Sequence, residues 1–304
     1  MRNGFYHIEL LFLLGLSACL EPFNPDIPDN QQSFLVVDGI ITDSPGPYTV
    51  KIWEANSFND DNQPVSGVQV TIEEQNGPTE NLTESSTGVY QTTSLQGLIG
   101  QSYRLNLSYQ GQQYQSTWET IYASPEIDSV YYQFETRGTT EQDIDQNGIQ
   151  FFVDNQGGDE AVRHFRYEWD ETWQLGVNWR SGNVYIGNDM VEPTQNPVYR
   201  CWTSSTSTTI NIATTVGLTE NVLSAHPLDF ISSEGERFTE RYSILIKQYA
   251  LSETEYDFWE NLKESNQELG SLFDKQPANI SGNISSNTGE KALGYFSASG
   301  VKEV

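Results

Sequence analysis

The sequence predicts a mainly β protein with two successive β-sandwich domains, of which the C-terminal one carries one packed α-helix. The chain is rich in Thr, Ser, Tyr, Val, Gly and Asn, which favour strands and turns over helices. Its apolar residues recur at alternate positions in short segments bounded by turn residues, which is the pattern of half-buried antiparallel strands. One segment, residues 252–269, has instead the apolar spacing of a helix.

The first 18 residues predict a signal peptide. The apolar run at residues 8–18 is shorter than the about 20 residues that a membrane-spanning helix needs, and Arg2 supplies the positive charge that precedes a secretion signal. Residues 16–19, Leu-Ser-Ala-Cys, resemble the lipobox of bacterial lipoproteins, which implies that Cys19 is diacylated and begins the mature chain. The alternative is an ordinary signal peptide followed by an incidental cysteine.

The first predicted domain spans residues 33–122, after an extended tether at residues 19–32 that holds three prolines. Residues 33–42 form a continuous apolar run, which predicts a strand buried on both faces. Strands with one buried face and hairpin turns at Asn76-Gly77 and Gly111 are predicted in the segments 48–53, 66–77 and 101–118. Short strands without an intervening helix favour an antiparallel sandwich.

The second predicted domain spans residues 123–304, and Pro125 marks its start. Ser252 and Glu255 form a capping box at the start of the predicted helix, which Gly270 ends. The strands predicted in this domain are 129–135, 148–155, 162–175, 241–251 as a central strand, and 292–301 as the last strand.

The segment 143–154 has the spacing of a calcium-binding loop, with Gly148 at the position of the sharp turn. An aspartate at the twelfth position instead of a glutamate, and flanks that resemble strands, favour a solvated acidic turn instead. The candidate calcium ligands are Asp143, Asp145, Asn147, the backbone carbonyl of Ile149, and Asp154. Calcium is the single cofactor that the sequence suggests.

Three aromatic residues are candidates for a sugar- or peptide-binding platform, because exposed rings stack on the apolar faces of ligands. Tyr167 and Trp173 lie on one side of a predicted strand, and Trp179 lies in a polar turn. Core packing explains the first two equally well, so Trp179 is the residue that we expect to be exposed.

The sequence contains none of the common catalytic signatures: no H-E-x-x-H, no G-x-S-x-G, no phosphate-binding glycine loop and no paired-cysteine metal site. Asp170 and Glu171 are adjacent on a predicted strand and therefore point to opposite faces. With Cys19 acylated, Cys201 has no disulfide partner, and we expect it to be a small buried hydrophobe. We expect no enzymatic activity.

Several segments together resemble domain-of-unknown-function family 4249 (DUF4249), which are lipoproteins of the Bacteroidota. They are FLVVDGIITD at 34–43, IDSVYY at 127–132 and the tract from Tyr242 to Ile284 followed by LGYFSASGV at 293–301. Within the first domain, residues 64–72 and 88–111 resemble a carboxypeptidase-regulatory (transthyretin-like) sandwich. The family has no established reaction, and its frequent association with TonB-dependent transporters implies an accessory role at the cell surface.

We therefore expect a non-enzymatic lipoprotein of the outer membrane that faces the cell surface and assists a TonB-dependent transporter or related barrel in substrate capture or complex assembly. Its expected partners are outer-membrane lipid, through Cys19, and that barrel. The net charge of −27 argues against nucleic acid as a partner, because phosphate groups are repelled. The alternatives are a free-standing glycan- or peptide-binding protein and, third, a hydrolase.

Overall fold

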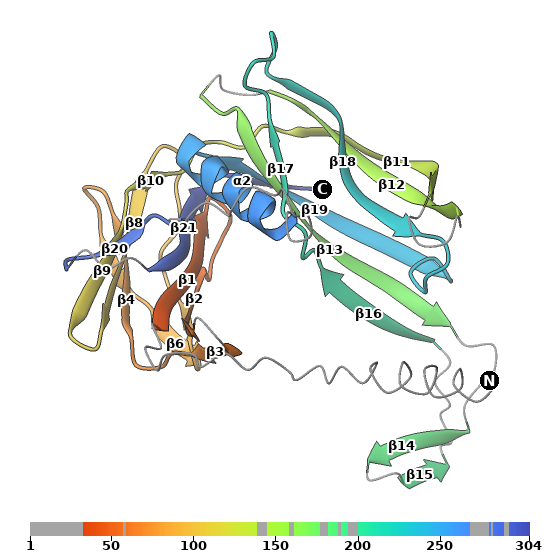
Figure 1. Cartoon of the computed structure of the whole chain (residues 1–304), viewed down its shortest axis with the longest axis horizontal. Helices are drawn as coiled ribbons and strands as arrows, with labels where there is room; N and C mark the ends of the chain where they lie inside the picture. The colour runs from red at the N-terminus through yellow and green to blue at the C-terminus, as the bar shows by residue number, and fades with distance from the viewer. Residues whose placement is uncertain are drawn as a thin grey trace, which may run out of the picture. The chain divides into compact units, whose positions relative to one another are not determined.

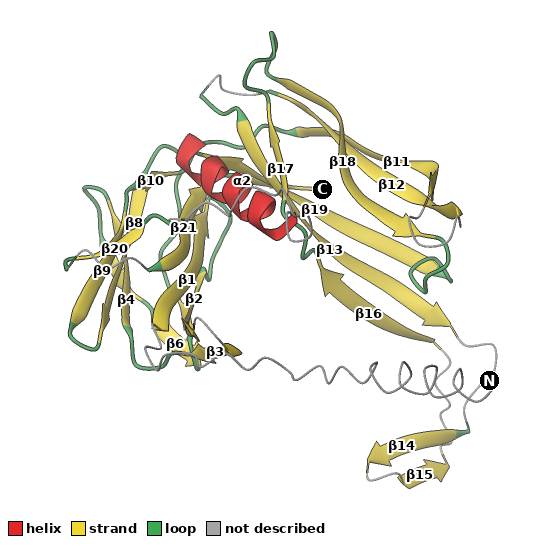
Figure 2. Cartoon of the chain, viewed as in Figure 1, coloured by secondary structure: helices red, strands yellow, loops and turns green. Residues whose placement is uncertain are grey.

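The computed structural model describes most of the chain after residue 32, and residues 33–304 form one compact unit. The protein is mainly β, and α2 (Glu253–Gln267) is the one helix in the described part, which confirms the predicted fold class (Figures 1 and 2). The described residues are 33–56, 59–138, 145–157, 161–176, 182–187, 190–193, 200–267, 280, 282–288 and 292–304.

Two sheets enclose the first core. Sheet 1 has the strand order β21 (Leu293–Ser299), β1 (Ser33–Thr42), β2 (Thr49–Asn56), β7 (Val89–Gln91) and β6 (Thr83–Ser86), with β3 (Asn59–Pro64) paired to β2. Sheet 2 has the order β20 (Ile284–Ser286), β9 (Gln112–Ser116), β8 (Ser102–Tyr109), β4 (Gln69–Glu74) and β5 (Thr79–Asn81), with β10 (Glu119–Thr120) paired to β8.

The alternation in the sequence gives β2 and β8 one buried face each, as predicted. Val50 and Ile52 on β2 and Leu105 and Leu107 on β8 pack into one apolar core. The predicted turn at Gly111 is confirmed as a tight two-residue turn between Tyr109 and Gln112, with positive φ at both central residues. Such a turn matches the right-handed twist of the strands that it joins.

Two further sheets enclose the second core. Sheet 3 consists of β11 (Ile127–Gly138), β12 (Asp145–Gln156) and β18 (Val222–Ser232). Sheet 4 has the order β16 (Arg200–Thr206), β13 (His164–Gly176), β19 (Arg241–Leu251) and β22 (Val301–Glu303), with β17 (Asn211–Thr214) paired to β13. A separate hairpin is formed by β14 (Asn183–Gly187) and β15 (Met190–Pro193).

β20 and β21 belong to the first pair of sheets, although they lie near the C-terminus of the chain. β21 pairs in parallel with β1, and β20 pairs with β9. Strands from both predicted domain ranges therefore share one core, and the sheets do not follow a boundary at residues 122 and 123. The division of the chain into two domains stays a prediction.

α2 packs against β13, β17 and β21 (Figure 2). The Ser252 hydroxyl accepts a hydrogen bond from the Glu255 backbone N–H at 3.2 Å, so Ser252 is the N-cap, as predicted. The Glu255 side chain does not complete the capping box, because it turns into the protein and is buried. Gly270, the predicted end of the helix, lies outside the described residues.

Candidate functional site

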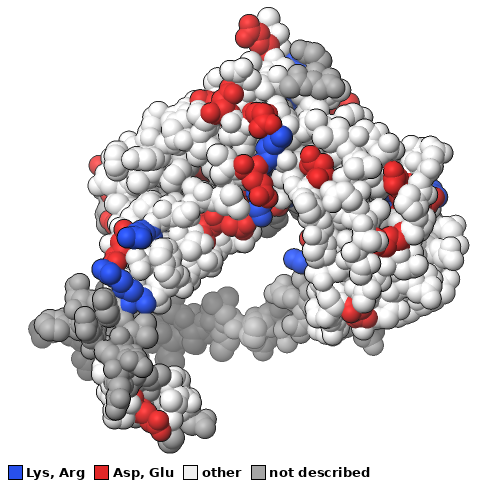
Figure 3. Space-filling model, turned by 180° about the vertical axis from the view of Figure 1, so that it is seen from behind, with Lys and Arg blue, Asp and Glu red and all other residues white. Residues whose placement is uncertain are grey.

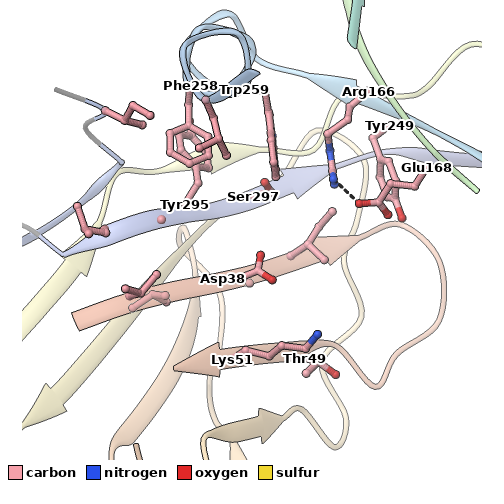
Figure 4. A pocket seen from close by; sticks show the side chains of 18 of the residues that line it. Asp38, Thr49, Lys51, Arg166, Glu168, Tyr249, Phe258, Trp259, Tyr295 and Ser297 are labelled. Carbon is pink, nitrogen blue, oxygen red and sulfur yellow. Dashed lines mark hydrogen bonds and ion pairs between the residues drawn. The ribbon is translucent and has the colours of Figure 1, made fainter. Parts of the chain in front are cut away.

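A pocket of about 590 Å³ lies between the outer face of sheet 1, α2 and one end of β13 and β19 (Figure 4). Its volume is in the range of sites for small-molecule ligands. Its walls are mostly apolar, with charged side chains from β1, β2 and β13. This combination of an apolar body and a few polar groups is typical of a ligand site.

The floor of the pocket is formed by the outward face of β1. Leu35, Val37 and Ile41 point into the first core, so the alternate residues Val36, Asp38 and Ile40 point to the other face, where they line the pocket. Val36 and Ile40 are half-buried and Asp38 is exposed. The prediction that this strand is buried on both faces is therefore wrong, because the second face borders a cavity.

α2 forms the roof at the apolar end of the pocket. Phe258, Trp259 and Leu262 line the pocket from the helix, and the Phe258 ring packs on Tyr295 of β21 with centroids 5.1 Å apart. Leu293 of β21 completes this end. In Figure 4 Phe258 and Tyr295 lie at one end of the pocket and the charged side chain of Arg166 at the other.

Arg166 of β13 is held between two aromatic rings. Its guanidinium carbon lies 4.7 Å from the centroid of the Tyr249 ring and 4.5 Å from that of the Trp259 ring. One terminal nitrogen donates a hydrogen bond to the Glu168 carboxylate (Figure 4). The side chain is largely buried, and its Nε–H has no hydrogen-bond partner among the described residues. An unpaired buried donor costs about 1–3 kcal/mol, so holding the guanidinium between the two rings carries a local cost in stability.

Asp38 and Lys51 are a pair of opposite charges on the floor of the pocket. They are directly opposite each other on β1 and β2, both are exposed, and no hydrogen bond or ion pair joins them in the described structure. Crowding by the pocket walls removes water from Asp38 and raises the pKa of its carboxyl, against the lowering effect of Lys51 and Arg166. Neither side chain is engaged in a hydrogen bond or ion pair in the described structure, so both can contact a ligand.

Behind the pocket, Glu255 of α2 is a fully buried carboxylate. It accepts hydrogen bonds from the Ser297 hydroxyl at 2.5 Å and from the Trp259 ring nitrogen at 3.3 Å. Burial raises the pKa of this carboxyl, although Arg166 and these hydrogen bonds act in the opposite direction. Glu255 thereby fixes the ring that stacks on Arg166.

Of the predicted aromatic platform, Tyr167 is in the core. Its hydroxyl donates to the side-chain oxygen of Gln248 at 2.8 Å, and Tyr167, Gln248 and Asn155 are all fully buried. Trp173 is half-buried, and its ring faces the guanidinium of Arg237 at 5.4 Å. Trp179 lies outside the described residues. The structure therefore does not bring Tyr167 and Trp173 together at an exposed surface, because the Tyr167 ring is fully buried and the Trp173 ring is half-buried against Arg237.

Arg237 also joins two carboxylates. Its guanidinium lies 3.2 Å from Glu171 and 3.8 Å from Asp229, and Glu171 accepts a hydrogen bond from the Tyr242 hydroxyl at 2.5 Å. Glu171 is buried. This cluster neutralises a buried charge within the sandwich, which is a structural role.

The candidate calcium loop, and the acidic turn that the sequence favours at the same place, are both replaced by an extended strand from Asp145 onwards. Asp145, Asn147, Ile149 and Asp154 all lie on β12, so the first and last of them are separated by most of the length of that strand. The Asp154 carboxylate accepts hydrogen bonds from the Ala225 backbone and the Ser129 hydroxyl. Asp143 lies outside the described residues. In the described part of the chain no group of three His, Cys, Asp or Glu side chains is arranged to hold a metal ion.

Of the two cysteines, Cys201 lies within the described residues and Cys19 does not. Cys19 lies outside the described residues, so its acylation stays a prediction. Cys201 is exposed on the edge strand β16, which corrects the expectation of a buried hydrophobe. β16 is exposed along nearly its whole length, with Thr203 alone half-buried, so neither face of the strand is covered at Cys201.

Sequence reasoning missed the pocket, although two signals pointed to it. Asp38 is an acid in the middle of the apolar run at 33–42, and Arg166 is a cation in a strand of aromatic residues. A buried or half-buried charge needs a partner, so each marks a place where packing alone does not explain the sequence. The assignment of these residues to one site required the parallel pairing of β1 with β21.

The fold and the site define a mainly β protein with an amphipathic pocket under a single helix. A model of the family described as "Domain of unknown function (DUF4249)" matches residues 20–304, and the chain therefore belongs to this family. No curated protein and no solved structure matches the chain. Across the described residues no helix has the length and apolar character needed to span a membrane.

Proposed function

We propose that this protein is a non-enzymatic, lipid-anchored protein of the outer membrane, exposed at the cell surface, that captures a small ligand in the pocket under α2 for a TonB-dependent transporter or related barrel. The observation that carries the proposal is the pocket itself, with mostly apolar walls and polar groups that have no protein partner in the described structure. Such a site suits binding and release better than permanent structure.

The surface is consistent with a protein that works in contact with water and not with nucleic acid. The formal net charge is −27, and Figure 3 shows acidic side chains spread over one face with few basic ones. A dispersed negative charge keeps a protein soluble and repels polyanions. This negative charge is compatible with small ligands, and with an uncharged or basic surface of a barrel, as partners.

The binding function is tested with N-phenyl-1-naphthylamine, an uncharged dye that fluoresces strongly in apolar surroundings. We expect the mature protein to bind the dye with a blue shift and increased emission. Leu262→Trp, which fills the apolar end of the pocket, is expected to abolish binding, whereas Trp202→Ala, which removes an exposed ring on β16, leaves it unchanged. Equal binding by both variants would place the dye elsewhere and contradict the proposal.

The lipid anchor is tested by metabolic labelling with an alkyne analogue of palmitate. We expect Cys19→Ser to lose the label and Cys201→Ser to retain it, because only Cys19 follows a lipobox-like sequence. Label on the Cys19→Ser protein would contradict the anchor.

The partner is tested by affinity purification of the full-length lipidated protein from gently solubilised native membranes. We expect one outer-membrane barrel at near-stoichiometric yield by mass spectrometry. Recovery of the protein alone under several mild conditions would contradict the accessory role and favour a free-standing binding protein, the second candidate.

A further inference from the structure

Two charged side chains line the pocket without a hydrogen-bond or ion-pair partner in the described protein. They are Asp38 and Lys51. They come from β1 and β2, which are neighbouring strands of sheet 1. A fold that collects unpaired charges of both signs around one cavity leaves that capacity to whatever enters the cavity.

The signs of these charges restrict the ligand. Arg166 and Glu168 already form an ion pair with each other, so their net contribution is small. This leaves one negative group, Asp38, and one positive group, Lys51. A purely anionic ligand would meet Asp38, and a purely cationic one would meet Lys51. A ligand that carries both charges satisfies both side chains at once.

The Asp38 and Lys51 side chains do not compensate each other strongly enough to prevent this. They lie directly opposite each other on neighbouring strands, but no hydrogen bond or ion pair joins them in the described structure, so neither charge is neutralised by a direct contact. A ligand that displaces the water from the pocket strengthens its own contacts with the same two groups.

The remainder of the pocket requires an apolar body. Phe258 lies at the end away from Arg166 (Figure 4), and Leu262 and Leu293 are further apolar residues of the pocket lining. The Arg166 guanidinium covers one face of the Trp259 ring and one face of the Tyr249 ring, so these two faces are not open to a ligand.

We propose that the pocket under α2 binds a small apolar zwitterion, namely a short peptide with free ends, whose ammonium contacts Asp38 and whose carboxylate contacts Lys51. This inference rests on the proposed binding function and names the class of its ligand. The apolar side chains of the peptide lie against Phe258, Leu262 and Leu293. Asp38 and Lys51 thus become the residues that distinguish free from blocked termini.

The experiment measures binding of the dipeptide Phe-Leu, of N-acetyl-Phe-Leu and of Phe-Leu-amide to the mature protein by calorimetry. We expect each blocked dipeptide to bind at least 10-fold more weakly than the free one. Asp38→Asn is expected to weaken free Phe-Leu at least 10-fold and to leave N-acetyl-Phe-Leu unchanged. Lys51→Met is expected to weaken free Phe-Leu and to leave Phe-Leu-amide unchanged. The control Asp128→Asn, on the exposed face of β11, changes none of these affinities.

Each remaining outcome has one meaning. Equal affinities for free and blocked dipeptides, or a loss in Asp38→Asn that is the same for both, overturns the zwitterion proposal. Dodecylphosphocholine, an apolar zwitterion without a primary ammonium or a carboxylate, is the comparison ligand, and its tighter binding also overturns the peptide assignment. If the naphthalene dye binds and no dipeptide does, the zwitterion proposal fails and the binding function stands. If neither binds, the proposed function itself fails.

Discussion

Glu255 is a buried acid whose neighbours hold it without an ion pair in the described structure. Its carboxylate accepts hydrogen bonds from Ser297 and from Trp259, and the charge of Arg166 acts on it from the pocket. Burial nevertheless dominates and raises the pKa of Glu255 above its ordinary value of 4.5. The residue that positions the Trp259 ring is thus also a group whose protonation is coupled to folding.

We predict that Glu255→Gln removes part of the pH dependence of stability. The folded protein binds the Glu255 proton more tightly than the unfolded chain, so the free energy of unfolding of the wild type falls as pH rises from 4.5 through the folded-state pKa of Glu255. Urea unfolding at pH 5, 6, 7 and 8 is expected to show the variant gaining on the wild type as pH rises. The control is Glu264→Gln, on an exposed position of α2. A difference that does not change with pH would contradict this linkage.

Glu80 illustrates the opposite sign. Burial acts to raise the pKa of this carboxyl, but hydrogen bonds from the backbone and hydroxyl groups of Thr93 and Ser94 outweigh it and lower the pKa to about 2. The stabilisation is present above pH 4.5 and is lost as pH falls towards 2. We predict that Glu80→Gln costs about 1–2 kcal/mol at pH 7.

The measurement for Glu80 is urea unfolding of the wild type and the variant at pH 7 and pH 3.5. The difference in free energy of unfolding is expected to be smaller at pH 3.5, because the unfolded chain binds the Glu80 proton below pH 4.5 while the folded protein keeps the carboxylate ionised. Glu220→Gln, in an exposed loop, is the control that should show no loss at either pH. A larger loss at pH 3.5 than at pH 7 would show that the Thr93 and Ser94 contacts do not favour the charged form.

At the scale of the element, local patterns were sufficient for most strands and for α2. Alternation predicted the buried faces of β2 and β8, and Ser252 predicted the start of the helix. The partners of the strands were not predictable, because pairing between distant segments such as β1 and β21 leaves no local signal. The apolar run of β1 predicts burial without saying that part of it borders a pocket.

We predict that Gly294→Ala weakens the pairing of β1 with β21. Gly294 has a φ of +91° and a Cβ there would lie 2.0 Å from the carbonyl oxygen of Val37. The backbone conformation alone costs about 1–3 kcal/mol for a residue with a Cβ, and the contact with Val37 adds to it. Thermal unfolding of the variant is expected to show a clear loss of stability.

Gly217→Ala separates the two contributions. Gly217 has a similar φ of +85°, but a Cβ there would have no atom within 4 Å. It therefore reports the cost of the conformation without the steric contact. Equal losses in the two variants would show that the Val37 carbonyl moves aside and that the β1–β21 pairing tolerates a side chain.

At the scale of the whole molecule, several contacts connect the two cores. Ile40 of β1 packs with Leu251 of β19 and Val301 of β22. Gln248 of β19 donates to the carbonyl of Pro125 at 2.8 Å and accepts from Asn155 at 2.8 Å, and both Gln248 and Asn155 are fully buried. Pro125, in the segment that follows the first core, is thus hydrogen-bonded to a residue of the second core. The Asn155 side-chain oxygen has no hydrogen-bond partner among the described residues, so the network is satisfied in part.

We predict that the mature protein unfolds in one calorimetric transition, with the van't Hoff enthalpy equal to the calorimetric enthalpy. Gln248→Leu leaves buried groups of Asn155, Tyr167 and Pro125 without their partner, so it is expected to cost about 2–4 kcal/mol. Gln133→Leu on the exposed face of β11 is the control. Two transitions in the wild type would instead support the division into two domains near residue 122. If Gln248→Leu alone splits a single transition in two, this network is what makes the two cores unfold together.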